Sequence, residues 1–127
     1  MGETTSILVV DDNPAMAKTL ADILEAKGLV VHAAASGAQA LQILQEQPVD
    51  ILLTDVKMPE MNGLELYRET RQPYPDLSTI FMTAYSADEL IQQGRAEGIR
   101  AILDKPLDIP FLFTLISAIK RINTISQ

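Results

Sequence analysis

Short runs of consecutive aliphatic residues alternate along the chain with longer segments in which apolar residues recur every three or four positions. Aliphatic runs bounded by turn residues are typical of strands buried on both faces, and the longer spacing is typical of amphipathic helices. The runs predict five strands, at residues 6–12, 30–34, 51–55, 79–83 and 101–103. The spacing predicts five helices, at about 14–27, from 36 or 37 up to Pro48, 64–72, 86–97, and from 109 or 110 to 122.

Capping residues indicate where several of these helices begin and end. Asn13 followed by Pro14 is typical of an N-cap and a first helical position. Gly28 is expected to end that helix. Ser86 and Glu89 have the spacing of a capping box for the fourth helix.

The apolar stripes of the first and last helices indicate which sides face the sheet. In the first helix the stripe comprises Met16, Leu20, Ile23 and Leu24. In the last helix it comprises Leu112, Leu115, Ile116, Ile119 and Ile122. Phe111 and Phe113 fall outside the middle of this second stripe. Two interpretations stay open for them: a broad contact with the core, or an exposed patch for dimerisation or docking.

Strands that alternate with helices through five units indicate an α/β fold, with a parallel sheet covered by helices on both faces. We expect a doubly wound, flavodoxin-like sandwich with strand order 2-1-3-4-5. In such folds ligands bind outside the carboxyl ends of the strands. The length of 127 residues predicts a single domain spanning 1–127, with a core from about 6 to 122.

Composition narrows the class of protein. Hydrophobic residues make up 47% of the chain, which is enough for a packed core, and the net charge of −7 with scattered Lys and Arg argues against direct nucleic-acid binding. No apolar run approaches the ~20 residues of a membrane span, and the first residues lack the features of a signal peptide. The chain has no cysteine, so disulfides and thiolate metal sites are excluded. We expect a cytoplasmic protein that does not bind a membrane.

Polar residues stand at the carboxyl ends of four predicted strands. These residues are Asp11 and Asp12 at the end of the first strand, Asp55 at the end of the third, Thr83 at the end of the fourth, and Lys105 after the fifth. The second strand ends in alanines, and it is an edge strand in the expected order. The four contributing strands are then neighbours, so we expect their polar side chains to converge on one crevice.

Charge suggests what this crevice does. Three carboxylates packed together repel one another by a few kcal/mol for each close pair, at an effective dielectric of about 20. A hard divalent cation relieves that repulsion, and Mg²⁺ (or Mn²⁺) suits a site of few carboxylates, carbonyls and retained waters. A carboxylate beside such an ion can attack a phosphoryl group, which makes Asp55 a candidate nucleophile. Lys105 and Thr83 would neutralise the oxygens of the transferring group. Each residue alone is typical of capping or turn chemistry, and only the combination indicates a site.

The segments around these positions resemble the receiver domain of two-component response regulators, of the chemotaxis-regulator type. The matching segments are ILVVDDNP at 7–14, LLTDVKMPEMNG at 52–63, MTAY at 82–85 and LDKP at 103–106. The resemblance extends from about residue 6 to residue 122, and such a set of motifs in this order and spacing is highly specific.

The resemblance implies a phosphorelay switch. A sensor histidine kinase or phosphotransfer protein would phosphorylate Asp55 from a phospho-His and shift the domain between inactive and active conformations. The implied site comprises Mg²⁺ ligands from Asp12, Asp55 and the carbonyl of Lys57, Asp11 assisting through water, and phosphoryl contacts from Thr83 and Lys105. The domain would catalyse only its own phosphorylation and dephosphorylation, so we do not expect an enzyme in the turnover sense.

The same resemblance implies further structural features. The Lys105–Pro106 bond is expected to be cis. The face built from the fourth helix, the fifth strand and the last helix is expected to carry the output, and it is a candidate homodimer interface. Receivers usually carry Tyr or Phe three residues before the lysine of the fifth strand, whereas this chain has Ile102. Signalling by a rotating aromatic therefore does not carry over. By the same analogy Lys57 and Tyr85 flank the path of attacking water and are candidates for tuning the phosphate lifetime.

Two other classes of protein fit the strand pattern. A Mg²⁺-dependent phosphatase or phosphotransferase with an aspartyl nucleophile commonly shows Asp-x-Asp, but the second position here is Lys57 and no cap domain is present. A flavodoxin-like binding module requires a hydroxyl-rich phosphate loop after the first strand, which this chain lacks. Turnover of a generic phosphate ester would favour the first alternative, and a yellow cofactor the second.

Overall fold

The computed structural model of the protein describes residues 4–84 and 88–126, with side chains through residue 120. Within this part of the chain, strands and helices alternate. The strands are β1 (Ser6–Val10), β2 (Val30–Ala34), β3 (Ile51–Asp55), β4 (Ser78–Thr83) and β5 (Ala101–Asp104). The helices are α1 (Pro14–Glu25), α2 (Gly37–Glu46), α3 (Gly63–Arg71), α4 (Glu89–Glu97) and α5 (Ile109–Ser126).

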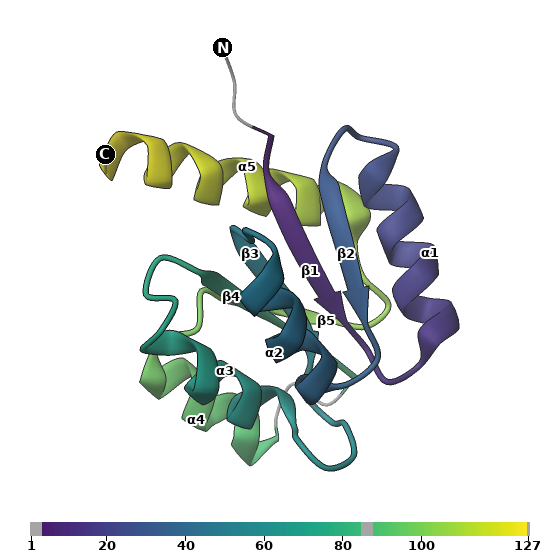
Figure 1. Ribbon diagram of the computed structural model, residues 1–127, viewed down its shortest axis with the longest axis vertical. Helices are drawn as coiled ribbons and strands as arrows, with labels where there is room; N and C mark the ends of the chain where they lie inside the picture. The colour runs from purple at the N-terminus through teal and green to yellow at the C-terminus, as the bar shows by residue number, and fades with distance from the viewer. Residues whose placement is uncertain (1–3, 85–87, 127) are drawn as a thin grey trace.

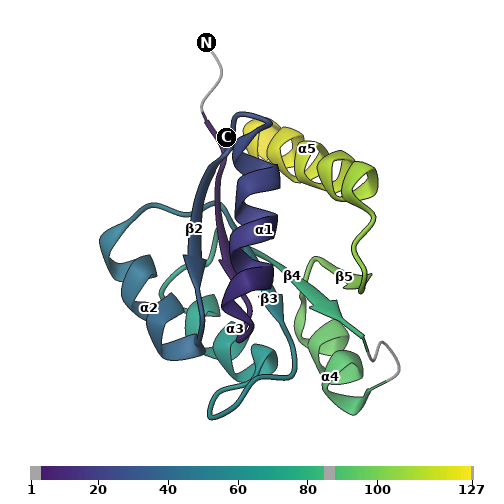
Figure 2. The same ribbon diagram turned by 90° about the vertical axis from the view of Figure 1, so that its right-hand side faces the viewer.

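The strands form one parallel sheet in the order β2-β1-β3-β4-β5. Helices α1 and α5 pack on one face of this sheet, and α2, α3 and α4 pack on the other (Figures 1 and 2). The predicted doubly wound α/β fold and its strand order are therefore confirmed. The order leaves β2 and β5 as the two edge strands.

Strand β1 shows why its apolar run contains no polar residue. Ile7 and Val9 face the cluster formed with α1 and α5, whereas Leu8 and Val10 face the cluster formed with α2 and α3. All four side chains are fully buried. Burying an aliphatic side chain of this size contributes roughly 1.5–3 kcal/mol. Packing on both faces therefore fixes the central strands and, with them, the positions of the residues at their carboxyl ends.

The buried stripe of α1 differs from the predicted one. Met16 and Ile23 were expected to face inward, but they are 52% and 36% exposed. The stripe that packs on the sheet comprises Ala17, Leu20, Ala21 and Leu24. Alanine has a short side chain, so a helix can approach a sheet closely through its alanines. The apolar spacing predicted the two larger residues inside, whereas the structure leaves them more exposed than the alanines.

Helix α4 begins at a different cap from the predicted one. Its N-cap is Asp88, whose Oδ1 accepts a hydrogen bond from the Leu90 N–H at 2.8 Å, and the helix starts at Glu89. The expected start at Ser86 was therefore wrong, and Ser86 and Tyr85 themselves lie outside the described residues. The cap of α1 was predicted correctly, since Asn13 accepts hydrogen bonds from the first turn.

Helix α5 packs through the expected stripe and treats its two aromatic residues differently. Leu112, Ile116 and Ile119 are buried, and the side chain of Ile122 lies outside the described residues. Phe113 is partly buried against the core, and the ammonium of Lys27 lies 5.7 Å from its ring centroid. Phe111 is 52% exposed. The aromatic pair thus divides between the two interpretations, one ring belonging to the core and the other to the surface. No helix in the described part of the chain is long and apolar enough to cross a membrane.

Candidate functional site

The carboxyl ends of four strands meet at one edge of the sheet. Strand β1 leads into Asp11, β3 ends at Asp55, β4 ends at Thr83, and β5 leads into Lys105. The parallel register aligns these ends. Residues far apart in the sequence therefore become neighbours at the edge where the strand order predicts that they converge.

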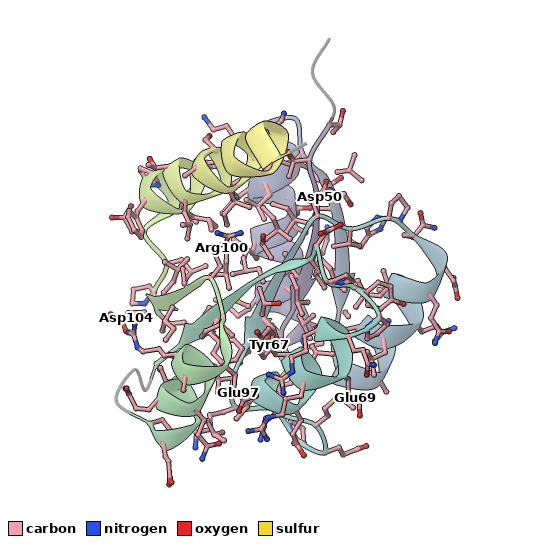
Figure 3. The ribbon with its side chains drawn as sticks, turned by 90° about the vertical axis from the view of Figure 1, so that its left-hand side faces the viewer. Asp50, Tyr67, Glu69, Glu97, Arg100 and Asp104 are labelled. Atoms are coloured by element: carbon pink, nitrogen blue, oxygen red, sulfur yellow. The ribbon has the colours of Figure 1, made fainter. Side chains whose placement is uncertain are left out.

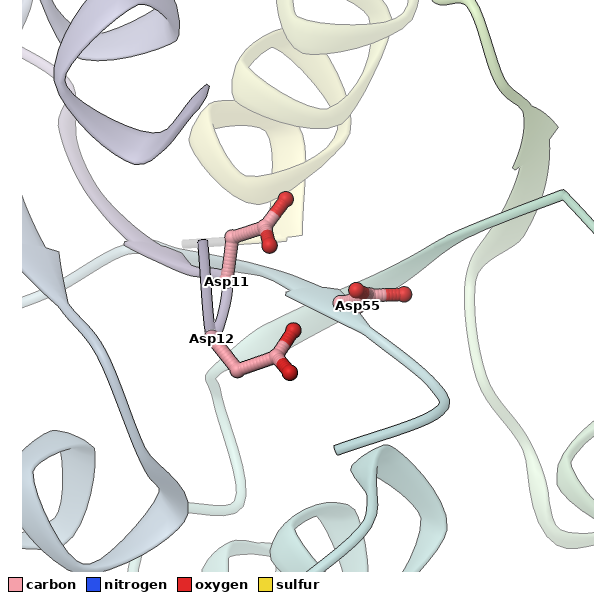
Figure 4. Close-up of side chains that lie close together, drawn as sticks. All are labelled: Asp11, Asp12 and Asp55. Carbon is pink, nitrogen blue, oxygen red and sulfur yellow. The ribbon is translucent and has the colours of Figure 1, made fainter. Parts of the chain in front are cut away.

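Three carboxylates gather at this edge (Figure 4). One oxygen from each of Asp11, Asp12 and Asp55 lies within 4.8 Å of the other two, and together with Lys105 we call these residues the acidic cluster. Asp11 and Asp55 are buried, whereas Asp12 is exposed. Hard divalent cations bind carboxylate oxygens grouped in this way. The donor set therefore fits the Mg²⁺ or Mn²⁺ expected from the sequence.

Lys105 supplies the counter-charge of the acidic cluster. Its ammonium lies 3.2 Å from Oδ2 of Asp11 and 3.1 Å from Oδ2 of Asp55. Its backbone N–H donates a hydrogen bond to the carbonyl oxygen of Thr83 at 2.8 Å. The Lys105–Pro106 peptide bond is cis, as expected. One side chain from the end of β5 thus joins the ends of β1 and β3.

Burial and charge act in opposite directions at Asp55. Burial is the largest influence on the pKa of its carboxyl group and raises that pKa, whereas the hydrogen bond and charge of Lys105 lower it; the pKa stays raised overall. The carboxylate of Asp11 raises that pKa further. Burial lowers the pKa of Lys105, but its two carboxylate partners outweigh burial, so its pKa is raised. One ammonium stands against three carboxylates, and a further positive charge would relieve the remaining repulsion.

Two other predicted site residues, Thr83 and Lys57, also lie near this edge, one buried in a strand and the other in a loop. Thr83 is buried at the last position of β4, on the strand that pairs with β3. The ammonium of Lys57, in the loop after β3, forms an ion pair with Asp88 at 2.7 Å. Asp88 was not predicted from the sequence, although an acidic residue just before a helix is a common N-cap signal.

The main chain around Asp55 is held by contacts with the preceding residue and with the start of α3. The hydroxyl of Thr54 donates a hydrogen bond to the carbonyl oxygen of Asp55 at 2.9 Å. The N–H of Gly63 donates to the carbonyl oxygen of Val56 at 2.8 Å. A Cβ atom at Gly63 would lie 2.6 Å from the carbonyl oxygen of Asp55, so glycine is required where α3 begins. These contacts fix the main chain, while the carboxylate of Asp55 remains directed at the acidic cluster.

The sequence that forms this fold and site matches one known protein family. The sequence profile of the response regulator receiver domain matches residues 7–117. The chain belongs to this family. In this receiver domain Ile102, at the position that usually carries an aromatic residue, packs partly buried against the cluster that contains Phe81 and Ile91.

The receiver domain is similar in sequence to parts of longer proteins. It is 40% identical over 108 residues to a response regulator receiver protein of Anaeromyxobacter sp. (strain Fw109-5), covering 85% of this chain and 45% of that protein. It is 36% identical over 115 residues to the sensor kinase CckA of Brucella abortus (strain 2308), covering 89% of this chain and 12% of that protein. The chain thus spans less than half of the length of these relatives.

Solved structures show the same fold. The receiver domain superposes on a response regulator receiver domain protein (CheY-like) from Methanospirillum hungatei JF-1 with a TM-score of 0.92. The two sequences are 26% identical, and the match covers 98% of this chain and all of the other. Family and fold agree that this is a receiver domain of two-component signalling systems. The acidic grouping of Asp11, Asp12 and Asp55 fits the role of a phosphoacceptor site.

Proposed function

We propose that Asp55 accepts a phosphoryl group from the phospho-His of a sensor histidine kinase or a phosphotransfer protein. The observation that carries this proposal is the ammonium of Lys105, which contacts Asp11 and Asp55 at the carboxyl edge of the sheet. The similarity to part of a sensor kinase supports this class of partner.

The residues of the acidic cluster suggest how the transfer proceeds. A carboxylate oxygen of Asp55 forms a bond to phosphorus as the P–N bond to the donor histidine breaks. The electron pair of that P–N bond stays on the imidazole nitrogen, which then takes a proton from water. Lys105 and the hydroxyl of Thr83 neutralise charge on the phosphoryl oxygens during transfer. Lys105 already contacts Asp55, so little movement is needed for it to reach the phosphoryl group.

Mg²⁺ or Mn²⁺ is part of this proposal. The carboxylates of Asp12 and Asp55 and the carbonyl of Lys57 would hold the ion, with Asp11 acting through a water molecule. The support is the grouping of three acidic side chains whose oxygens lie within 4.8 Å of one another. When bound, the ion supplies positive charge beside the phosphoryl oxygens.

We infer that the domain acts as a switch and not as an enzyme that turns over free substrates. Phosphorylation adds roughly −1.5 to −2 charges, and here it adds them to an edge that already holds three acids. The phosphoryl group stabilises the conformation that contacts it better. The domain would then catalyse only its own phosphorylation and hydrolysis.

Phosphoryl donors test the site assignment. With Mg²⁺ and either acetyl phosphate or phosphoramidate, a small donor with a P–N bond, the intact mass of the wild type should rise by one phosphoryl group. Asp55→Asn should abolish this gain. Asp76→Asn, which changes an exposed aspartate away from the cluster, should retain it. An Asp55→Asn variant labelled as well as the wild type would refute the assignment, and turnover of p-nitrophenyl phosphate would favour a phosphatase instead.

A homodimer through the face of α4, β5 and α5 is a second part of the proposal. Phe113 contacts Lys27, which follows the C-terminal end of α1. Phe111 lies two positions earlier on a helix with about 100° per residue, so it faces away from α1. It is 52% exposed and offers apolar surface on that flank. Light scattering should show a doubled mass with beryllofluoride and Mg²⁺, and Phe111→Ser should remove the effect. A monomer under both conditions at high concentration would contradict self-association.

A further inference from the structure

The C-terminal end of α4 is tied to α3 by several contacts. The carboxylate of Glu97 accepts a hydrogen bond from Nε of Arg68 at 2.9 Å and pairs with Arg71 at 3.1 Å. The hydroxyl of Tyr67 donates to the backbone carbonyl of Glu97 at 2.7 Å. Figure 3 shows Tyr67 and Glu97 at the junction of the two helices. We call Arg68, Arg71 and Glu97 the helix clamp.

The middle of α4 packs directly on the sheet. Ile91 is fully buried, and a Cβ atom at Gly94 would lie 2.6 Å from the ring of Phe81. The backbone of α4 therefore rests on the aromatic ring of β4 near the same end as the helix clamp. This part of the helix has little room to shift.

The N-terminal end of α4 is held differently, through both oxygens of one carboxylate. Oδ1 of Asp88 caps the helix by accepting from the Leu90 N–H at 2.8 Å. Oδ2 of Asp88 forms the ion pair with Lys57 at 2.7 Å. The hydrogen bond from Lys57 is the main cause of a lowered pKa at Asp88. This ion pair joins the start of α4 to the loop that follows Asp55.

Lys57 is close enough to the phosphoacceptor to leave this ion pair for another partner. It follows Asp55 by two residues, so their Cα atoms are at most about 7 Å apart. Its side chain is half exposed, and its long flexible stem can redirect the ammonium. A phosphoryl group on Asp55 would bring roughly 1.5–2 negative charges, more than the single charge of Asp88.

We propose that, when Asp55 is phosphorylated, the ammonium of Lys57 breaks its ion pair with Asp88 and binds the phosphoryl group. This exchange of partners releases the N-terminal end of α4. The helix then turns about the helix clamp and the Gly94–Phe81 contact, which stay in place. This inference rests on the phosphorylation of Asp55 proposed above. By linkage, the ion pair and the phosphoryl group compete for one ammonium, so each weakens the binding of the other.

Competition predicts that the two halves of the ion pair affect phosphoryl binding in opposite directions. Beryllofluoride, an analogue of the phosphoryl group, would be titrated at saturating Mg²⁺ and followed by fluorine NMR. Lys57→Met removes a contact to the analogue and should weaken its binding roughly two- to five-fold. Asp88→Asn retains the N-cap, since Asn caps helices as well as Asp, but removes the competitor and should strengthen binding by a similar factor.

Lys18→Met, which breaks an exposed ion pair on α1, is the matched control and should leave the affinity for beryllofluoride unchanged. A purely structural ion pair would make the Lys57→Met and Asp88→Asn variants change affinity in the same direction. That result would overturn the proposal.

Amide hydrogen exchange locates the released end. Beryllofluoride should speed exchange at Leu90 and Ile91, which depend on the cap at Asp88. Gly98 and Ile99, whose N–H groups bond within the other end of the helix, should keep their protection. Asp88→Asn keeps the cap but loses the ion pair to Lys57, so in this variant the first two amides should exchange faster before any analogue is added. An equal response at both ends, or none at Leu90, would contradict the proposal.

Intact mass separates failure of this inference from failure of the proposed function. If the wild type gains a phosphoryl group from acetyl phosphate while exchange at α4 does not respond to beryllofluoride, the partner exchange is wrong and the phosphoacceptor role stands. If the wild type gains none, the proposed function fails and the inference fails with it.

Discussion

Two groups of charged side chains tie elements of this receiver domain together, with opposite balances of charge. In the acidic cluster one ammonium, that of Lys105, stands against three carboxylates. In the helix clamp one carboxylate, that of Glu97, stands against two guanidinium groups. The side chains of Asp11 and Asp55 are 4% and 12% exposed, whereas the two arginines of the clamp are nearly half exposed.

The difference separates a site that is built for a ligand from a contact that is complete without one. Water screens the surplus positive charge of the helix clamp, so the clamp needs no further ion. The surplus negative charge of the acidic cluster is screened less because two of its three carboxylates are buried. The pKa values reflect this contrast, since burial raises that of Asp55 while its arginine partners lower that of Glu97.

The largest expected effect is that of a divalent cation. At a Mg²⁺ concentration about 100-fold above its Kd, binding to the folded state should add about 2.7 kcal/mol to the free energy of unfolding. Urea unfolding with and without Mg²⁺ measures this increment. Asp12→Asn should lose most of it, because one carboxylate ligand is gone, whereas Glu97→Gln should keep it. Equal increments in the wild type and Asp12→Asn would place the metal elsewhere.

A smaller effect is expected from Asp55→Asn in the absence of metal. The variant lacks a buried charge, so near pH 7 it should be more stable than the wild type. Because folding raises the pKa of Asp55, the folded wild type binds a proton as the pH falls through that raised value. The difference should therefore shrink toward zero below the ordinary pKa of 3.8. Urea unfolding near pH 7 and at a pH below 3.8 tests this.

In the same experiment, Glu97→Gln is expected to change the free energy of unfolding in the opposite direction. Folding lowers the pKa of Glu97, so its contribution to stability is present above the ordinary value of 4.5 and is lost as the pH falls through the lowered one. The variant should be less stable than the wild type near pH 7, and the gap should close in acid. If both variants changed stability in the same direction, the two clusters would not differ as described.

The smallest effect is expected from Arg71→Met. Arg68 still pairs with Glu97 in this variant, and both arginines are largely exposed. Urea unfolding should show no resolvable change in the midpoint. Lys105→Met is the matched comparison, because it leaves Asp11 and Asp55 buried without their cation and should clearly lower the midpoint. Similar losses in the two variants would show that the helix clamp is as dependent on each cation as the acidic cluster.

Much of the site could be predicted because it follows from the strand pattern. Aliphatic runs with no polar gap identify strands buried on both faces, and β1 confirms this at each position from Ile7 to Val10. Once the strand order is known, the residues at the carboxyl ends have to converge. The approach of Lys105 to Asp11 and Asp55 needed no further information than the order and direction of the strands.

The remaining features depend on packing in three dimensions, which the local sequence pattern does not specify. Ser86 and Asp88 are both good N-cap residues within one turn, and spacing alone did not distinguish them. Met16 and Ile23 have the right period for a buried stripe, but close packing favoured the alanines beside them. The ion pair of Lys57 with Asp88 joins two loops, and such pairs depend on how elements are oriented in three dimensions.

Gly63, at the start of α3, limits where the domain can change its shape. The first turn of that helix rests against the main chain of the phosphoacceptor, with no space for even a methyl group at Gly63. A displacement of Asp55 toward α3 would be blocked by this contact at once. Motion that follows modification of the carboxylate is therefore expected at the neighbouring helix on the same face, α4, whose first turn is fastened by the side chain of Asp88.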